Sequence, residues 1–154
     1  MTPRVSIQKT LFTLVCCLTL SAGAFAIDGV TISDKMLNSF KQTFPDAEQV
    51  KWLESADRYT VNFKENGILT KIDYDKDGNF ISSLRYYSEK NLPINILCRL
   101  QKKYADKKVF GVTEMTSEAT VEYYIKLEDA ENWITIKSNA DGNMQVVEKY
   151  KKAP

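Results

Sequence analysis

The chain contains no histidine, and its six glycines are scattered along it. Without imidazole it lacks the most common general base and the most common metal ligand, so ordinary Ser-His and Cys-His nucleophile pairs are excluded. No glycine-rich loop of the kind that cradles phosphates is present. We therefore expect a protein that is not an enzyme and that holds no metal and no cofactor.

An excess of charge of one sign is also missing. The 21 lysines and arginines nearly balance the 20 aspartates and glutamates, which gives a formal net charge of +1. Proteins that bind nucleic acids need a basic surface. We therefore expect no nucleic-acid partner.

The first 26 residues have the pattern of a secretory signal peptide. Arg4 and Lys9 precede an uncharged, mostly apolar run that ends at Ala24-Phe25-Ala26, the small-x-small pattern of a cleavage site. The run is shorter than the roughly 20 apolar residues that a spanning helix needs. We expect cleavage after residue 26, a periplasmic location, one domain over residues 27–154, and no membrane span in the mature chain.

Cleavage removes Cys16 and Cys17 and leaves Cys98 as the only thiol. An exported chain with one cysteine cannot form an internal disulfide, and one thiolate does not make a zinc site. The sequence favours a small, buried Cys98 on a helix over a reactive thiol.

The mature chain contains an internal sequence repeat. Residues 59–86 can be laid over residues 123–150 without a gap. The matches include Tyr59 with Tyr123, Ile72 with Ile136, and Asp77-Gly78-Asn79 with Asp141-Gly142-Asn143. This predicts two repeats, at about residues 33–88 and 92–150.

Each copy begins with a helical pattern. Ser33 is a suitable N-cap, and Leu37, Phe40 and Phe44 then share one helix face until Pro45 ends it. In the second copy Pro93 precedes the same stripe, formed by Leu97, Leu100 and Tyr104.

Four strands are expected after each helix. Tyr59, Val61 and Phe63 alternate with polar residues, and Asn66-Gly67 and Asp77-Gly78 are hairpin turns. The predicted fold class is α+β: a tandem repeat of a helix plus a four-stranded antiparallel sheet, with the helices packed on one sheet face. We expect the two units to share one core.

A single helix per unit leaves the other sheet face open. By alternation, aromatic, aliphatic and basic side chains point away from the helices, and Trp52 is expected in the core. The candidate binding residues on the open face are Leu69, Lys71, Tyr124, Lys126 and Trp133.

The sequence is compatible with two other kinds of site, a cation site and a catalytic carboxylate pair. The run from Asp73 to Gly78 resembles the start of a calcium loop, but Leu84 stands where a bidentate glutamate would be needed, so a hairpin turn is favoured. Acids are plentiful in predicted turns, and a carboxylate pair for hydrolysis stays open on composition alone. These acids are Asp57, Glu65, Asp129 and Glu131.

Short motifs across the mature chain resemble the PepSY-like periplasmic proteins of Bacteroidetes, which are grouped with the beta-lactamase-inhibitor-protein fold. The motifs are Phe44-Pro45-Asp46-Ala47, Val50-Lys51-Trp52, Tyr59-Thr60-Val61-Asn62-Phe63, Gly67, Tyr74-Asp75 and Gly78. The resemblance implies tandem helix-plus-four-strand repeats in an envelope protein, with relatives that bind or inhibit secreted enzymes. It transfers no functional residue, because the matching positions are turn and core residues.

The sequence thus predicts an exported, non-enzymatic binding or inhibitory module that uses the open face of its sheet. The expected partner is another envelope or secreted protein. The alternative is an envelope protein that binds a small molecule or a cation at the turn of residues 73–77.

Overall fold

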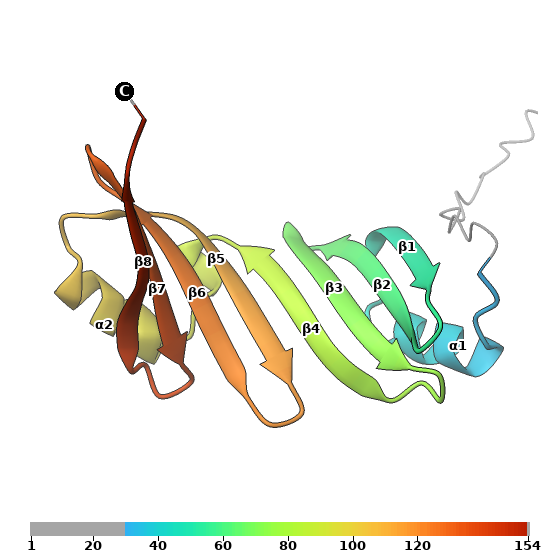
Figure 1. Ribbon diagram of the computed structural model, residues 1–154. Helices are drawn as coiled ribbons and strands as arrows, with labels where there is room; N and C mark the ends of the chain where they lie inside the picture. The colour runs from blue at the N-terminus through green and yellow to red at the C-terminus, as the bar shows by residue number, and fades with distance from the viewer. Residues whose placement is uncertain (1–29, 154) are drawn as a thin grey trace, which may run out of the picture.

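The computed structural model describes residues 30–153, so the predicted signal peptide lies outside the described residues. Two α-helices, one short 3-10 helix and eight strands follow one another along the chain (Figure 1). Their bounds are α1 Asp34–Thr43, β1 Glu48–Glu54, β2 Arg58–Glu65, β3 Ile68–Asp75, β4 Phe80–Tyr87, η1 Glu89–Asn91, α2 Ile94–Lys103, β5 Lys108–Ser117, β6 Val121–Glu128, β7 Asn132–Asn139 and β8 Met144–Lys151. Neither α-helix in residues 30–153 has the length and apolar character needed to cross a membrane.

All eight strands form one antiparallel sheet, and their order in space is their order along the chain. Short hairpins connect the strands except between β4 and β5, where η1 and α2 intervene. The result is an α+β architecture in which a helix and four strands are followed by a second helix and four more strands.

Local signals fix the helix ends. The Ser33 side chain accepts a hydrogen bond from the backbone N–H of Met36, and Asp34 lies in the first turn, where the helix dipole favours a negative charge. The N–H of Phe44 closes the last turn on the carbonyl of Phe40, and Pro45 follows. In α2, the N–H of Tyr104 bonds to the carbonyl of Leu100 in the same way.

The β3–β4 and β7–β8 turns are built alike. Gly78 and Gly142 both have positive φ, +89° and +80°, a conformation that side chains rarely adopt. Asp75 and Asn139 each accept a hydrogen bond from the backbone N–H four residues on. A Cβ on either glycine would meet a helix side chain, Met36 on α1 at 3.1 Å or Arg99 on α2 at 3.0 Å. Each turn therefore lies close to a helix.

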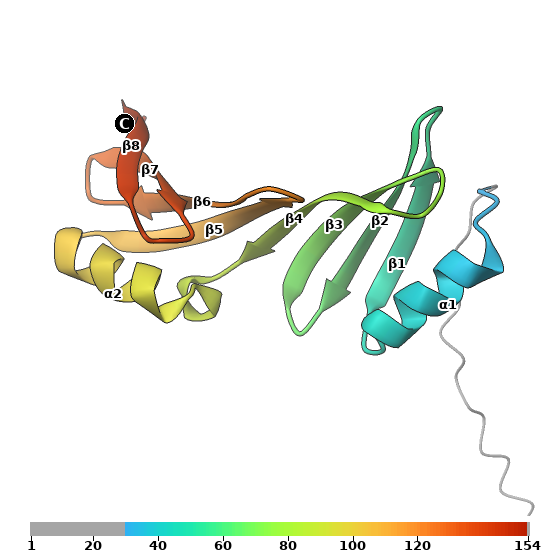
Figure 2. The same ribbon diagram turned by 90° about the horizontal axis from the view of Figure 1, so that it is seen from below.

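Both helices lie on the same side of the sheet (Figure 2). Strand register agrees with this arrangement. Ile72, buried under α1, pairs with Ser83, and Ser83 pairs with Thr116, which shares a face of β5 with Val112, buried under α2. Phe63 and Leu127, which the sequence alignment equates, are both buried on this face, at 4% and 0% exposure.

The expectation of one shared core is wrong. Buried side chains form two clusters, one around Phe40, Trp52 and Val61 and the other around Leu100, Ile125 and Ile136. Eight strands span roughly 34 Å at about 4.8 Å per neighbour, whereas each helix is about 10 Å wide. Two helices cannot cover such a sheet, so each builds a core over its own strands.

Two predictions for single residues come out differently. Trp52 is buried at 2% exposure, as expected, and packs edge-on against Phe40. The prediction that Cys98 is buried is wrong, because its side chain is exposed. The buried residues of α2 are Ile96 and Leu100, and Cys98 lies about 200° around the helix from each of them, on the solvent side.

The exposed and buried isoleucines of α2 give a matched test of the second core. Ile96 has 0% exposure and Ile94 has 72%. Ile96→Ala leaves a cavity beneath the helix and should lower the free energy of unfolding by about 2–5 kcal/mol. Ile94→Ala should change it by less than about 0.5 kcal/mol. Urea unfolding followed by circular dichroism measures both, and equal effects would contradict the assigned core.

Candidate functional site

The seam between β4 and β5 inverts the usual distribution of polar and apolar side chains. Ser83 and Arg85 of β4 share the helix side with Glu114 and Thr116 of β5, as the register Ser83–Thr116 and Arg85–Glu114 shows. The intervening side chains therefore point to the face that carries no helix. They are Leu84 and Tyr86 of β4 and Met115 of β5.

A charged network holds the helix side of the seam. Arg85 Nη1 lies 3.1 Å from Glu114 Oε1, and the Tyr87 hydroxyl donates to Glu114 Oε2 at 2.5 Å. The Glu114 side chain is only 12% exposed, so these two partners satisfy a carboxylate that is largely removed from water. Burial, followed by the hydrogen bond to Glu114, raises the pKa of Tyr87 well above its usual value. Tyr87 therefore stays a neutral hydrogen-bond donor to Glu114.

An apolar patch results on the open face. Leu69 pairs directly with Tyr86, and Leu84 pairs directly with Met115. Leu69, Tyr86 and Met115 are 53%, 45% and 43% exposed. We call Leu69, Leu84, Tyr86 and Met115 the central patch. Only Leu69 of these was predicted from the sequence, although the reversed alternation of residues 82–87 was a visible signal for Leu84 and Tyr86.

Tyr124 lies in the same transverse row as Leu69. The row runs from Leu69 through Tyr86 and Thr113 to Tyr124 and Lys137. The Tyr124 hydroxyl donates to Glu122, and Lys137 Nζ lies 2.7 Å from Glu122 and 5.6 Å from the Tyr124 ring centre. The hydrogen bond from Lys137 lowers the pKa of Glu122. This ion pair borders the central patch on the β6–β7 side.

Lys71 borders the patch on the β3 side. Its Nζ lies 3.4 Å from Asp73 Oδ2, and Asp73 is buried at 7% exposure. Asp73 also accepts hydrogen bonds from Thr60 and Ser82 across the neighbouring strands. Asp73 therefore belongs to the sheet face, and only Asp75 of the predicted calcium-like run organises the turn, through the backbone N–H groups of Asp77 and Asn79.

Trp133 and Lys126 form a second group near the β7–β8 edge. Phe110 meets Trp133 edge-on at 5.0 Å, and Lys126 Nζ lies 5.2 Å from the Trp133 ring centre. Lys126 also donates to the Tyr150 hydroxyl, and Lys152 lies over Trp133 at 4.7 Å. We call Phe110, Trp133 and Tyr150 the aromatic corner. Trp133 is partly covered, whereas Phe110 is 63% exposed.

The five predicted residues thus lie on one face of the sheet, but they fall into two separate groups. Lys126 and Trp133 are in contact, Leu69 belongs to the central patch, and Tyr124 and Lys71 lie beside it. Leu69 and Tyr124 are three strands apart, about 14 Å. The exposed residues Tyr86, Met115 and Phe110 and the partly buried Leu84 also line this face, although none of them was predicted from the sequence.

Two of the four acids that left hydrolysis open, Asp57 and Asp129, are used in turns and ion pairs. Asp57 contacts Arg58 at 2.7 Å, and the hydrogen bond from Arg58 lowers the pKa of Asp57 to about 2. Asp129 Oδ1 accepts from the backbone N–H groups of Glu131 and Asn132, and Oδ2 lies 3.0 Å from Lys107 Nζ. Within residues 30–153, no three or more cysteine, aspartate or glutamate side chains gather as they would around a metal ion.

Asp129 gives a pH-dependent test of this assignment. The hydrogen bond from Lys107, followed by those from the turn, holds the pKa of Asp129 well below its usual 3.8. A lowered folded-state pKa stabilises the protein above pH 3.8, and this contribution is lost as the pH falls through the folded-state pKa. Asp129→Asn should therefore melt at a lower temperature than the wild type at pH 7, and the difference should shrink below pH 3.8.

Thermal unfolding between pH 7 and pH 2 measures the effect. Asp141→Asn, in the β7–β8 turn, is the matched control and should follow the wild type. A constant difference between wild type and Asp129→Asn across this pH range would contradict the ion pair.

Comparison with known proteins places the fold. No protein-family model and no curated protein sequence matches the chain. Solved structures do match. A BLIP-like protein from Bacteroides fragilis aligns with a TM-score of 0.56 and 17% identity over 79% of this chain and 87% of that one. A DUF2874 family protein from Bacteroides ovatus aligns with a TM-score of 0.56 and 20% identity over 80% and 89%.

A third structure, a predicted periplasmic protein from Bacteroides eggerthii, aligns with a TM-score of 0.55 and 16% identity over 79% of this chain and 90% of that one. At these identities the similarity concerns the fold alone. The chain therefore has the fold of BLIP-like and DUF2874 proteins of Bacteroides.

Proposed function

We propose that this protein is an exported, periplasmic, non-enzymatic module that captures or inhibits an envelope or secreted protein through the open face of its sheet. The single observation that carries the proposal is the central patch. It places apolar side chains in water at the middle of the sheet, on the face opposite both helices.

An exposed apolar patch is energetically unfavourable in water unless a partner covers it. Leu69, Tyr86 and Met115 are close to half exposed, whereas polar side chains occupy the helix side of β4 and β5 at Ser83, Arg85, Glu114 and Thr116. Contiguous apolar surface with a polar border is typical of sites that bind proteins. Tyrosine and methionine are enriched at such sites, because they bury much area and adapt to a partner.

Charged pairs surround the patch. Lys71 and Asp73 lie on one side, and Lys137 and Glu122 on the other. Each pair is internally neutralised, so the border offers hydrogen bonds and directional contacts without a strong net field. Such a border contributes to specificity more than to affinity.

The aromatic corner supplies a second anchor in this proposal. Trp133 is held between Phe110, Lys126 and Lys152, so little side-chain freedom would be lost on binding. Phe110 and Tyr150 present exposed ring surface next to it, at 63% and 42% exposure. A partner long enough to contact both groups would lie across β3 to β8.

The proposal includes the architecture expected from the sequence: a signal peptide over residues 1–26 and a PepSY-like domain made of two repeats. The repetition is supported by the matching turns at Gly78 and Gly142 and by the equivalent burial of Phe63 and Leu127. The periplasmic location is supported by the leader pattern and by the fold shared with a predicted periplasmic protein. The non-enzymatic assignment is supported by the lack of histidine and by the structural use of Asp57 and Asp129.

Substitution of the patch tests the proposal. The double variant Tyr86→Ser, Met115→Ser removes the exposed apolar area without touching either core, and it should weaken binding to an envelope protein at least tenfold, as loss of a hot spot does. The immobilised protein would first capture its partner from a native envelope extract, and the affinity of the purified pair would then be measured by surface plasmon resonance.

Ile94→Ser is the matched control, since it removes a 72%-exposed apolar side chain from the helix side. Trp133→Ala should weaken binding as well, because it removes the ring against which Phe110, Lys126 and Lys152 pack in the aromatic corner. Equal affinities of the patch double variant, the control and the wild type would show that the open face is not the binding surface.

The alternative, cation binding at the turn of residues 73–77, has less support. Asp73 is engaged with Thr60, Ser82 and Lys71, which leaves too few oxygen ligands at the turn for a calcium site. Calorimetric titration with calcium chloride should therefore give no binding heat above that of dilution. A saturable signal that disappears in Asp75→Asn would restore the cation-binding function.

A further inference from the structure

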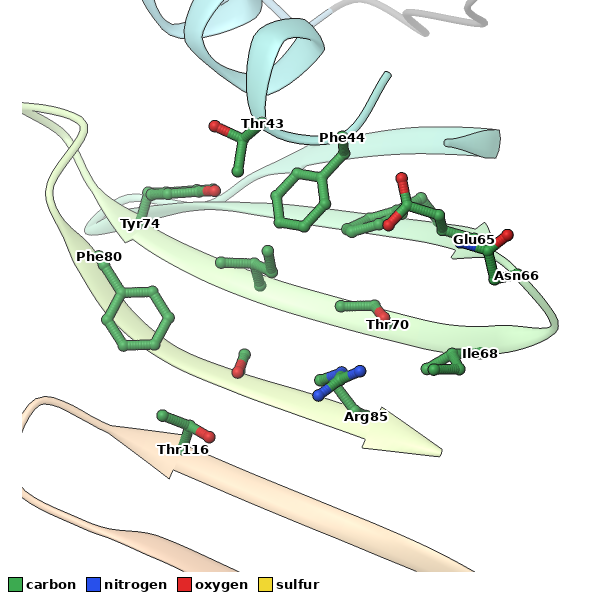
Figure 3. A pocket seen from close by; sticks show the side chains of 13 residues that line it. Thr43, Phe44, Glu65, Asn66, Ile68, Thr70, Tyr74, Phe80, Arg85 and Thr116 are labelled. Atoms are coloured by element: carbon green, nitrogen blue, oxygen red, sulfur yellow. The ribbon is translucent and has the colours of Figure 1, made fainter. Parts of the chain in front are cut away.

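A cavity of about 540 Å³ lies on the helix side, on the face opposite the proposed protein-binding surface. It opens beside the C-terminal end of α1 and extends over β3 and β4 to Thr116 of β5 (Figure 3). Pockets of this volume are typical of small-molecule sites. The cavity exists because two helices are too narrow to cover eight strands.

The floor of the cavity is apolar and rigid. Phe63 and Ile72 belong to the first core cluster and are at most 5% exposed. The aromatic rings of Phe44 and Phe80 and the side chain of Ile68 complete the apolar lining. Phe44 is fixed by Phe40 and Phe63, at ring-centre distances of 5.3 and 4.7 Å. An apolar ring or chain would therefore meet a preformed surface.

Hydrogen-bond donors gather at the β4–β5 side of the cavity. Arg85 pairs with Thr70 in the sheet register, and the neighbouring Ser83 pairs with Thr116. Within residues 30–153, the hydroxyls of Thr70, Ser83 and Thr116 make no hydrogen bond to the protein, and none of the three is fully buried. One cation and three hydroxyls thus face the same cavity.

Glu114 holds the guanidinium group of Arg85 in place. It engages Nη1 at 3.1 Å, and among the described residues it is the only acceptor of a hydrogen bond from Arg85. Nε and Nη2 are left to a ligand, and the Arg85 side chain is 39% exposed. Two free nitrogens of a planar guanidinium group can donate two parallel hydrogen bonds to one carboxylate. Glu65 lines the cavity on β2, two strands from Arg85, so a second negative charge is disfavoured at that end.

We propose that this cavity binds a small amphipathic monocarboxylate, with its apolar body on Phe44, Phe63 and Ile72 and its carboxylate on Arg85. The hydroxyls of Ser83 and Thr116 lie where they can donate to the same carboxylate. This site is separate from the open face, and it goes beyond the proposed function.

Three probes with one apolar body and different head groups test the chemistry: 4-phenylbutyrate, 4-phenylbutanol and 4-phenylbutylamine. Titration into the purified, isotope-labelled protein should shift the backbone amide signals of Thr70, Ser83 and Thr116. The carboxylate should bind about tenfold more tightly than the alcohol, which corresponds to about 1.4 kcal/mol. The amine should bind most weakly.

The double variant Arg85→Gln, Glu114→Gln removes the guanidinium group and, with it, the carboxylate that would otherwise lose its partner. It should abolish the preference for the carboxylate probe. Arg99→Gln, on α2, makes the same change of residue type outside the cavity and should keep the preference. Ser83→Phe fills the cavity and should remove the binding of all three probes; Thr116→Phe serves if Ser83→Phe does not fold.

The proposal is overturned if none of the probes shifts these amide signals, or if the alcohol binds as tightly as the carboxylate. Retention of the carboxylate preference in the Arg85→Gln, Glu114→Gln variant would equally rule out the assigned site. The Tyr86→Ser, Met115→Ser variant should bind 4-phenylbutyrate normally, so failure here and failure of the open face as a binding surface are distinguishable.

Discussion

The width of the sheet relative to its helices is the constraint on which the rest of this structure depends. Eight strands in one antiparallel sheet span roughly 34 Å, and two helices of ten residues cover only part of one face. Two cores therefore form, and β4 and β5 meet where neither helix reaches. The Arg85–Glu114–Tyr87 network supplies at this seam the interactions that hydrophobic packing supplies elsewhere.

The polar seam has opposite consequences on the two faces. On the helix side it leaves donors beside the apolar floor of the cavity near Phe44 and Arg85. On the open side the same alternation turns Tyr86 and Met115 toward solvent. A flat surface suits a protein partner, and a cavity with a few oriented donors suits a small molecule. One register thus generates two surfaces of different chemistry.

The similarity to BLIP-like and DUF2874 structures concerns the backbone. Turn and core residues such as Gly78 and Val61 specify that backbone, and they carry no information about a partner. The side chains proposed for recognition, such as Leu69 and Phe110, are exposed and lie outside both core clusters. At 16–20% identity, the similarity to these structures concerns the fold alone.

The sequence alone determined the helices, the hairpins and the buried face of most strands, because caps, positive-φ turns and alternation act over a few residues. It identified Trp52 and Phe63 as core and the outward direction of Leu69 and Trp133. Only the tertiary structure decided that the cores separate, that Cys98 faces solvent, and that Tyr86 and Met115 adjoin. Those outcomes depend on the order of the eight strands in the sheet and on how many strands each helix covers. Local sequence patterns specify neither.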